Sequence, residues 1–314
     1  LLSGERRFLP RTPSSKKAVW GKSAAQRVGV ARSVNKVPAR VLYARFFRGM
    51  IRYGKTLYGG YMKKVLGCIR RADDDFDMFE PGDRVAVGVS GGKDSLLLLK
   101  ALSLYRLFSH KDFKLEGLML TMGLEPFDTT GVEKMCEEIG VPLTIKKTDI
   151  GKIVFEERQE KNPCALCAKM RRGALNELAA EHGCNKLALG HHRDDAIETL
   201  LMSLFFEGRL HTFHPVTCLS RSGITVIRPM IYVPEKDIIH EARVQRLPIV
   251  KSPCPANGHT ARQDMKDLLT ELTKRYPFVR ERLLSALQNK EQYGLWDQKR
   301  SGSLTAPETS GKEE

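Results

Sequence analysis

The sequence predicts an α/β protein with a doubly wound parallel sheet, preceded by an N-terminal helical arm and followed by C-terminal helices. Short apolar runs alternate with helical patterns between residues 81 and 290, which is typical of parallel strands joined by right-handed helical crossovers. The first run, 85–89, is rich in Val and ends in a glycine turn, as buried parallel strands do. Glycine or polar residues follow three of the runs, where open α/β sheets bind their ligands.

The order of the elements follows from the spacing of apolar residues. We expect strands at 85–89, 115–122, 143–149, 186–190 and 225–230. We expect helices at 96–107, 131–139, 164–182, 194–206, 234–245, 260–274 and 278–289. A further helical pattern covers 41–71, and the acidic run 73–77 indicates a break before the first strand.

Four regions are expected from composition. They are a disordered basic arm at 1–40, an N-terminal helical segment at 41–80, the α/β domain at 81–290 and a polar tail at 291–314. Eighteen of the 52 Lys and Arg lie in 1–71 beside a single acid, so the net charge of +15 belongs to this part of the chain. A basic arm suits RNA phosphates, whereas a disordered arm, a mis-assigned start or a transit peptide has the same composition. The aromatic and basic residues of 41–71 suit RNA stacking or a helix docked on its own domain.

Composition also indicates the cellular compartment of the protein. No apolar run approaches the roughly 20 residues of a membrane span, so no membrane association is expected. The seven cysteines are odd in number and accompany a nucleotide-binding pattern, which argues against a disulfide framework. We therefore expect a reducing compartment, the cytoplasm.

The stretch after the first strand is predicted to bind phosphate. It consists of Ser90, Gly91, Gly92, Lys93, Asp94 and Ser95. Two glycines permit a tight turn, and the following helix start offers unpaired amides and the positive end of its dipole. Lys93 adds a positive charge, and Asp94 is a candidate ligand for Mg²⁺. Only three residues separate Gly88 from Gly92, so this is not a Walker loop. A tight turn without a ligand is the alternative.

Two other strand ends contribute candidate residues. They are Met122, Gly190, His191, His192, Asp194 and Asp195. The two His and two Asp could bind a divalent metal or orient a nucleobase or Mg²⁺–ATP. Alternatively, Asp194 caps the next helix, Asp195 lies in its first turn, and one His packs under the sheet. We expect a structural role for one of these residues and a functional role for at least one other.

Three cysteines form a candidate metal site. Cys164 and Cys167 open a predicted helix, whose dipole favours thiolates, and Cys254 lies in a proline-rich loop. Three cysteines suit a [4Fe–4S] cluster with one iron open to a ligand such as sulfide, whereas His259 could complete a Cys₃His zinc site. Three cations follow the pair, at Lys169, Arg171 and Arg172. They suit either RNA contacts or a solvated helix face.

Taken together, these motifs resemble the TtcA family, the tRNA 2-thiocytidine synthetases, within the PP-loop ATP pyrophosphatases. The resemblance comprises residues 90–95, 164–173, 189–195, 227–230 and Cys254. It implies ATP with Mg²⁺, and a [4Fe–4S] cluster on Cys164, Cys167 and Cys254. It also implies adenylation and then 2-thiolation of a cytidine in the tRNA anticodon loop, at position 32.

The resemblance further implies the roles of the individual residues. ATP would be bound by 90–95 together with Met122, Gly190 and His191. Catalysis would use Asp94, Asp194 and Asp195 with the three cysteines. The implied partners are tRNA, a sulfur donor such as a cysteine desulfurase, and a second copy in a homodimer.

One departure and two alternatives accompany this interpretation. Asn257 stands where another branch of the family has a second cysteine after the late one, which bears on substrate identity. One alternative is another PP-loop enzyme, either a 2-thiouridine synthetase or a lysidine-type tRNA ligase. The other is a non-catalytic, zinc-containing protein that binds nucleotides or RNA.

Overall fold

The computed structural model describes residues 60–123, 127–158, 163–250 and 261–289. All of them belong to one compact unit, residues 47–314. The predicted basic arm, most of the 41–71 helical pattern, the polar tail and Cys254 lie outside the described residues. Within these ranges, no helix is both long and apolar enough to cross a membrane.

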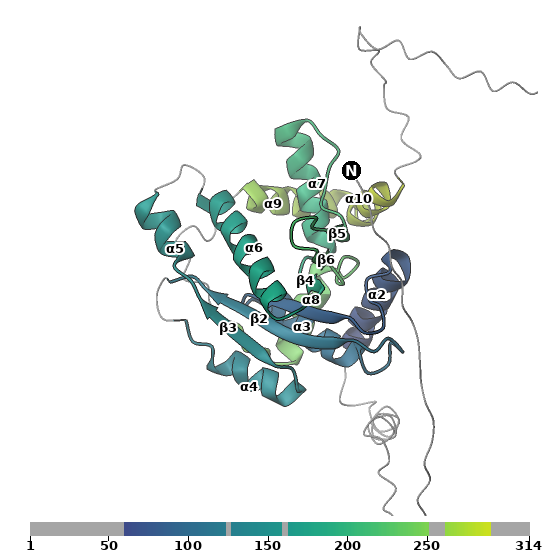
Figure 1. The fold of residues 1–314 in the computed structure, drawn as a ribbon. Helices are drawn as coiled ribbons and strands as arrows, with labels where there is room; N and C mark the ends of the chain where they lie inside the picture. Colours follow the sequence, from purple (N-terminus) through teal and green to yellow (C-terminus); the bar gives the residue numbers. More distant parts are fainter. Residues whose placement is uncertain (1–59, 124–126, 159–162, 251–260, 290–314) are drawn as a thin grey trace, which may run out of the picture. The chain divides into compact units, whose positions relative to one another are not determined.

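A six-stranded sheet forms the centre of the fold (Figure 1). Its order is β3-β2-β1-β4-β6-β5. The strands are β1 (Arg84–Val89), β2 (Lys114–Thr121), β3 (Leu143–Lys147), β4 (Lys186–Ala188), β5 (Val216–Cys218) and β6 (Thr225–Ile227). All neighbours pair in parallel except β5 with β6. The chain goes from β1 to β2 on one side and later to β4 on the other, which confirms the doubly wound prediction and makes the β1–β4 boundary a topological switch point.

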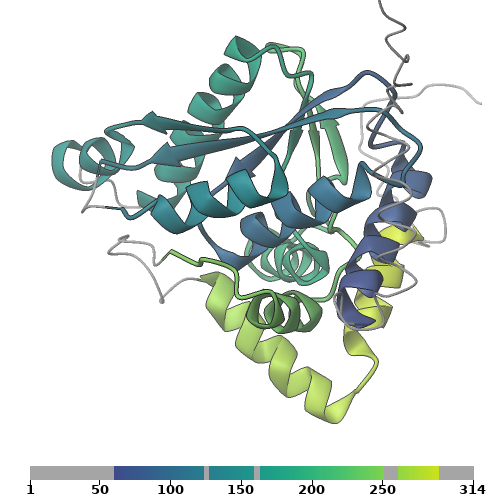
Figure 2. The same cartoon turned by 90° about the horizontal axis from the view of Figure 1, so that it is seen from below.

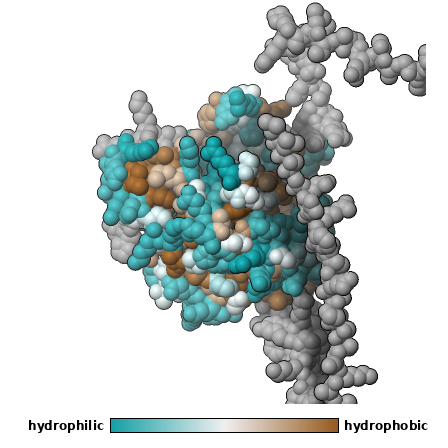
Figure 3. All heavy atoms as spheres, viewed as in Figure 1, coloured by the Kyte–Doolittle hydropathy of each residue, from teal (hydrophilic) through white to brown (hydrophobic). Residues whose placement is uncertain are grey.

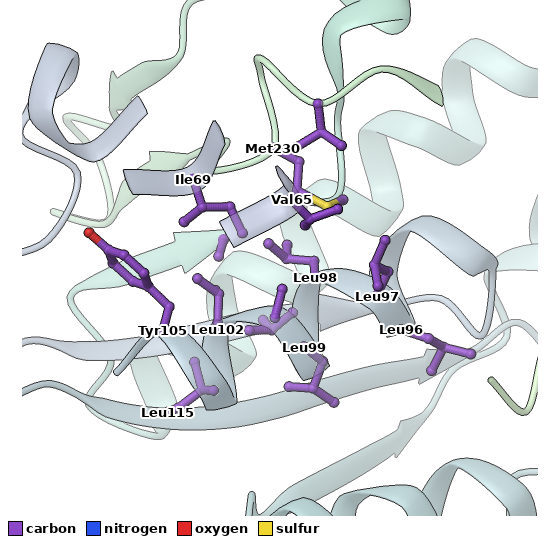
Figure 4. Close-up of a cluster of buried hydrophobic side chains, with 14 of the residues drawn as sticks. Val65, Ile69, Leu96, Leu97, Leu98, Leu99, Leu102, Tyr105, Leu115 and Met230 are labelled. Carbon is purple, nitrogen blue, oxygen red and sulfur yellow. The ribbon is translucent and has the colours of Figure 1, made fainter. Parts of the chain in front are cut away.

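Helices cover both faces of this sheet, as Figure 2 shows with the strands nearly edge-on. One face carries α2 (Gly60–Phe76), α3 (Lys93–Tyr105), α4 (Thr130–Ile139) and α8 (Glu235–Val244). Figure 4 shows the centre of this layer, where Val65 and Ile69 of α2 face the leucines of α3. The other face is covered by α6 (Pro163–Glu181), whose Leu178 and Ala179 pack against Leu118 and Leu187 of the strands.

Three helices stand beyond the carboxyl ends of the strands. α7 (Arg193–Glu207) packs against α9 (Ala261–Arg275) and α10 (Val279–Gln288) through Ile197, Leu201 and Leu269. In Figure 1, α7 extends away from the sheet with α9 and α10 beside it.

The structure differs from the sequence prediction at the ends of several helices and strands. The helix before β1 runs to Phe76, so the acidic run 73–77 is not a break. Asp73 is buried there and accepts hydrogen bonds from the Phe79 amide (3.0 Å) and the Tyr105 hydroxyl (2.7 Å). Residues 148–149 and 189–190 were expected in strands but lie beyond β3 and β4.

Three short elements were not expected from the sequence. Cys218, predicted to lie in a loop, ends the edge strand β5. A short helix, α5 (Ile150–Lys152), and a π-helical turn, η1 (Ile153–Glu157), lead toward α6. None of the three has enough residues to produce a recognisable apolar period, because a three-residue strand and single helical turns are shorter than the pattern that would reveal them.

Candidate functional site

The stretch predicted to bind phosphate forms the turn between β1 and α3. Gly91 has a φ of 80°, a backbone conformation that favours glycine. A Cβ at this position would lie 3.0 Å from the Phe127 ring and 3.1 Å from Val250 Cβ. The Val250 amide donates a 3.0 Å hydrogen bond to the Gly91 carbonyl. The turn is therefore closely surrounded, and its backbone conformation requires glycine.

Two serines hold this turn from within. Ser95 Oγ accepts a 3.1 Å hydrogen bond from the Ser90 amide and lies 3.1 Å from Ser90 Oγ. Ser95 Oγ also donates to the Gly92 carbonyl at 3.0 Å. The amides of the first turn of α3 have no acceptor within the helix, and this is the arrangement by which helix N-termini bind phosphate.

Lys93, the first residue of α3, lies between two carboxylates. Its Nζ is 3.0 Å from Asp94 Oδ1 and 3.2 Å from Glu235 Oε1. Glu235 begins α8 and also contacts Lys266 Nζ of α9 at 2.7 Å. Burial lowers the pKa of Lys93, but the carboxylates of Asp94 and Glu235 outweigh it and raise the pKa above its usual value. The ammonium group therefore stays charged beside the turn.

The chain leaving β4 packs directly onto the start of α3. A Cβ on Gly190 would lie 3.1 Å from the Asp94 carbonyl carbon and 3.1 Å from the Ser95 nitrogen. Such a close approach between two backbones is open to glycine alone. His192 is buried two residues later and places Nε2 3.7 Å from Asp94 Oδ1. The structure thus brings the predicted Gly-His-His motif onto the phosphate-binding turn.

His192, and not Asp194, caps α7. Its Nδ1 accepts from the Asp195 amide at 3.4 Å, and its own amide donates to Asp195 Oδ2 at 2.9 Å, which forms a capping box. Asp194 is buried, and both its oxygens are occupied, by Arg280 Nη1 at 2.5 Å and the Glu235 amide at 2.8 Å. Asp194 therefore joins α7 to α8 and α10, which is the structural role expected for one member of this motif.

Asp195 keeps a partly exposed carboxylate in the site. Its Oδ1 lies 3.5 Å from Arg262 Nη1 of α9, which also contacts the buried Glu198 at 3.3 Å. Among the described residues, no three His, Cys, Asp or Glu side chains converge as metal ligands would. Binding of a divalent metal by the two His and two Asp stays a prediction.

His191 packs on Phe213, with ring centroids 5.0 Å apart. The Arg228 guanidinium lies 4.9 Å from the centroid of the same Phe213 ring. Burial lowers the pKa of His191 to about 4; Asp195 opposes this shift and Arg228 adds to it. His191 is therefore neutral at pH 7, and its buried Nδ1 has no hydrogen-bond partner among the described residues.

Met122 lies at the end of β2, on the other side of β1 from Gly190. Its carbonyl accepts a 2.7 Å hydrogen bond from the Gly151 amide. Gly123 follows with a φ of 69°, and a Cβ there would lie 2.8 Å from the Thr148 carbonyl oxygen. This strand end is therefore closely packed, with a half-buried apolar side chain beside the phosphate-binding turn.

The predicted cysteines are described only in part. Cys164 is exposed and Cys167 is half-buried, and they lie three residues apart at the start of α6, on one side of the helix. Cys254 lies outside the described residues. Accessible thiols at this spacing are a suitable donor pair for an iron–sulfur cluster, and they suit zinc equally. Within the described part of the chain, two of the three expected ligands are thus in a position to bind metal.

Comparison with known proteins extends this description. The model of a PP-loop domain family, ATP_bind_3, matches residues 68–271. The tRNA-cytidine(32) 2-sulfurtransferase of Geotalea daltonii is 40% identical over 240 residues, which cover 76% of this chain and 95% of the relative. The enzyme of the same name from Geobacter sulfurreducens is 41% identical over 238 residues, which cover 75% and 93%.

The chain belongs to the TtcA family of tRNA-cytidine(32) 2-sulfurtransferases. The fold agrees with this assignment. The structure of the U34-tRNA thiolase NcsA from Methanococcus maripaludis, which has a [4Fe-4S] cluster, matches with a TM-score of 0.60 at 27% sequence identity. The match covers 79% of this chain and 84% of NcsA. The family predicted from the motifs is thereby confirmed.

Several residues of this TtcA-family site were not predicted from the sequence. They are Glu235, Arg262 and Arg280, which pair with Lys93, Asp195 and Asp194 respectively, and Lys266, which pairs with Glu235. All four come from helices far along the chain, and their spacing is that of ordinary charged helix faces. The only local signal is Pro234 immediately before Glu235, since proline is common at helix starts.

Proposed function

We propose that this chain is an ATP-dependent tRNA thiolase that replaces the C2 oxygen of a cytidine, at position 32 of the anticodon loop, with sulfur. One observation carries the proposal. The phosphate-binding turn is hydrogen-bonded at Gly91 to Val250, and Cys254 follows Val250 by four residues. Only three residues separate these two positions in the sequence, so a predicted metal ligand follows closely on the segment that contacts the turn. One short segment of the chain therefore connects the phosphate-binding turn to a candidate thiol ligand.

The activation step uses the residues around this turn. The pyrophosphate end of ATP binds to the amides of 91–95 and to Lys93, with the adenosine toward Met122 at the end of β2. The C2 oxygen attacks the α-phosphorus and pyrophosphate leaves, which gives an O-adenylated base. Cations and helix amides stabilise the charge that develops on the phosphates. Asp94, with Asp195 opposite it, would hold Mg²⁺, which neutralises phosphate charge.

The second step replaces AMP with sulfur. Cys164, Cys167 and Cys254 would hold a [4Fe–4S] cluster, which would supply sulfur at the oxidation level of sulfide to the activated base. The exposed position of Cys164 at the start of α6 leaves this side of the site accessible to a base extruded from an RNA loop. A sulfur donor such as a cysteine desulfurase, a homodimeric state and a cytoplasmic location stay predictions.

Nucleoside mass spectrometry tests the proposal. tRNA from a strain that lacks the gene should contain no 2-thiocytidine, and expression of the intact chain should restore it. Unchanged 2-thiocytidine in the deletion strain would reject the substrate. Loss of 2-thiouridine instead would favour the reaction of U34-tRNA thiolases, a second candidate that the similarity to NcsA supports.

Metal analysis tests the cofactor separately. Protein purified without oxygen should contain iron and acid-labile sulfide in equal amounts, near four of each per chain. Zinc without iron in such a preparation would contradict the cluster and support the zinc alternative.

A further inference from the structure

The basic side chains near the site fall into two groups. Those around the phosphate-binding turn are each paired with a carboxylate, as Lys93 is with Asp94 and Arg280 is with Asp194. Arg228 differs. Its Nη1 donates to the His214 carbonyl at 2.6 Å and to Thr217 Oγ1 at 3.4 Å. Among the described residues, no carboxylate forms an ion pair with it.

Arg172 of α6 lies near Arg228. Among the described residues, it too forms no ion pair with a carboxylate. Leu175, one turn after Arg172, packs close to Leu189, since both would contact a Cβ placed on Gly88. The Leu189 amide in turn donates to the Ile227 carbonyl, directly before Arg228. Both arginines therefore lie near the carboxyl edge of the sheet. Figure 3 shows the face that α6 covers, with hydrophilic residues spread among apolar ones.

The two charges are not compensated within the described part of the chain. Burial, and to a smaller extent the nearby Arg172, lower the pKa of Arg228 to about 10. Its buried Nε also has no hydrogen-bond partner among the described residues. A half-buried guanidinium beside a second cation costs free energy unless an anion binds. Paired arginines of this kind are suited to phosphate, which they bind through two parallel N–H groups.

The position of the pair indicates which phosphate it binds. Strand order places β6 two strands from β1, on the opposite side from β2. With strands about 4.8 Å apart, Arg228 lies on the order of 10 Å from the phosphate-binding turn, and Met122 lies on the other side. Arg172 is five residues beyond Cys167 on the same helix. The pair is therefore on the sulfur side of the site and away from the adenosine side.

We propose that Arg172 and Arg228 bind a backbone phosphate of the RNA substrate, beside the nucleotide that enters the site. The inference rests on the proposed function, because it assigns RNA contacts to the same site. Arg228 is positioned by the His214 carbonyl and stacked on Phe213, and Arg172 binds the same phosphate from α6. Binding of the RNA then supplies the anion that the free protein lacks.

RNA affinity measured over a range of salt tests this proposal. The full-length protein is titrated with an unmodified tRNA transcript, and ATP affinity is measured in parallel. Arg172→Gln and Arg228→Gln should each weaken RNA binding roughly ten-fold at 0.1 M salt and reduce the slope of log K against log salt by about one. ATP affinity should stay within two-fold of the parent. The double variant should lose less than the product of the single losses, because neighbouring groups on one phosphate are not additive.

Two controls separate RNA binding from folding. Arg221 is exposed in the β5–β6 turn, at the opposite edge of the sheet, so Arg221→Gln makes the same charge change without the expected loss. Arg172 donates no side-chain hydrogen bond that the structure shows, so Arg172→Gln should keep the parent melting temperature. Arg228→Lys keeps the positive charge but loses the two parallel N–H donors of the guanidinium, and should recover only part of the RNA affinity.

The possible results have distinct meanings. If the parent binds RNA and neither glutamine variant weakens it, the inference is wrong and the proposed function stands. If the variants lose ATP affinity instead, the pair belongs to the nucleotide and the inference is again wrong. If the parent itself binds no RNA, both the inference and the proposed function fail.

Discussion

Gly190 allows the chain after β4 to pack directly against the ATP-binding turn. It follows the strand by two residues and lies against the backbone of Asp94 and Ser95, where a Cβ would be 3.1 Å from two atoms and 3.3 Å from the Asp94 carbonyl oxygen. These neighbours are main-chain atoms in the first turn of a buried helix, so they cannot rotate away. The requirement for glycine at this position comes from close approach and not from an unusual backbone dihedral.

Gly190→Ala should therefore weaken ATP binding. We expect at least a ten-fold loss of ATP affinity together with about 1–3 kcal/mol of destabilisation, because the added methyl group displaces the turn. Isothermal titration and denaturant unfolding measure the two effects. Gly173→Ala is the matched control, since a Cβ there meets nothing within 4 Å and alanine stabilises a helix by about 0.5–1 kcal/mol. Unchanged ATP affinity in Gly190→Ala would contradict the packing argument.

His191 makes the stability of the fold depend on pH. Burial lowers its pKa to about 4 in the folded chain, with Asp195 opposing the shift, whereas an unfolded histidine has a pKa near 6.5. Between these values the unfolded chain binds more protons, so protonation favours unfolding. The contribution is absent above pH 6.5 and grows as the pH falls to 4.

Removal of His191 should flatten this dependence. We expect the parent to lose about 3 kcal/mol from this residue between pH 6.5 and pH 4, and His191→Gln to lose correspondingly less. Urea unfolding at pH 7, 6, 5 and 4 provides the comparison. His211→Gln removes an exposed imidazole and should follow the parent. Parallel curves for the parent and His191→Gln would show that His191 is not neutral in the fold.

At the scale of elements, α2 is joined to α3 by a buried carboxylate as well as by apolar packing. Asp73 is 1% exposed and accepts from the Phe79 amide, the Tyr105 hydroxyl and Lys111 Nζ, the last at 2.8 Å. Burial, followed by the hydrogen bond to Asp73, raises the pKa of Tyr105 well above its usual value. This joint lies at the far end of α3 from Lys93, about 18 Å along the helix at 1.5 Å per residue.

Asp73→Asn should therefore destabilise the fold without affecting the site. An amide cannot accept all three hydrogen bonds or balance Lys111, and we expect about 1–3 kcal/mol of destabilisation with ATP affinity unchanged. Asp74→Asn alters the neighbouring exposed residue and should stay within about 0.5 kcal/mol of the parent. Thermal unfolding measures both variants, and equal melting temperatures would refute a role for Asp73 in joining the helices.

At the scale of the whole molecule, the site has two parts on different supports. The ATP part consists of the β1–α3 turn with Gly190 and His192 packed against it. The proposed sulfur part begins at the exposed start of α6, which rests on the opposite face of the sheet from α3. Since the two parts share no side chain in the described residues, each should be removable without the other.

Single substitutions should separate the two parts. Cys164→Ala is expected to lose most of the iron and to retain ATP affinity within two-fold. Asp94→Ala is expected to keep its iron and to bind Mg²⁺–ATP at least ten-fold more weakly, because the proposed Mg²⁺ ligand beside the phosphates is lost. Cys218→Ala removes an exposed thiol on the edge strand β5 and should alter neither property. Full iron content in Cys164→Ala would contradict the proposed ligand set.

The sequence by itself determined the family and the sheet and predicted the main site residues, because these depend on local patterns. A Val-rich run before two glycines predicts a buried strand and a phosphate-binding turn, and a Cys-x-x-Cys at a helix start predicts a metal-binding pair. Each signal is contained within a few consecutive residues. The comparison with tRNA-cytidine(32) 2-sulfurtransferases confirmed the family that these signals indicated.

Only the tertiary structure decided what each polar residue in the site does. Asp194 and Asp195 are adjacent and chemically identical, yet Asp194 is enclosed by Arg280 and the Glu235 amide while Asp195 keeps an accessible carboxylate. Glu235, remote in sequence, binds Lys93 of the ATP turn. These roles depend on partners from distant helices, and the packing of α7, α8, α9 and α10 around the strand ends brings those partners together.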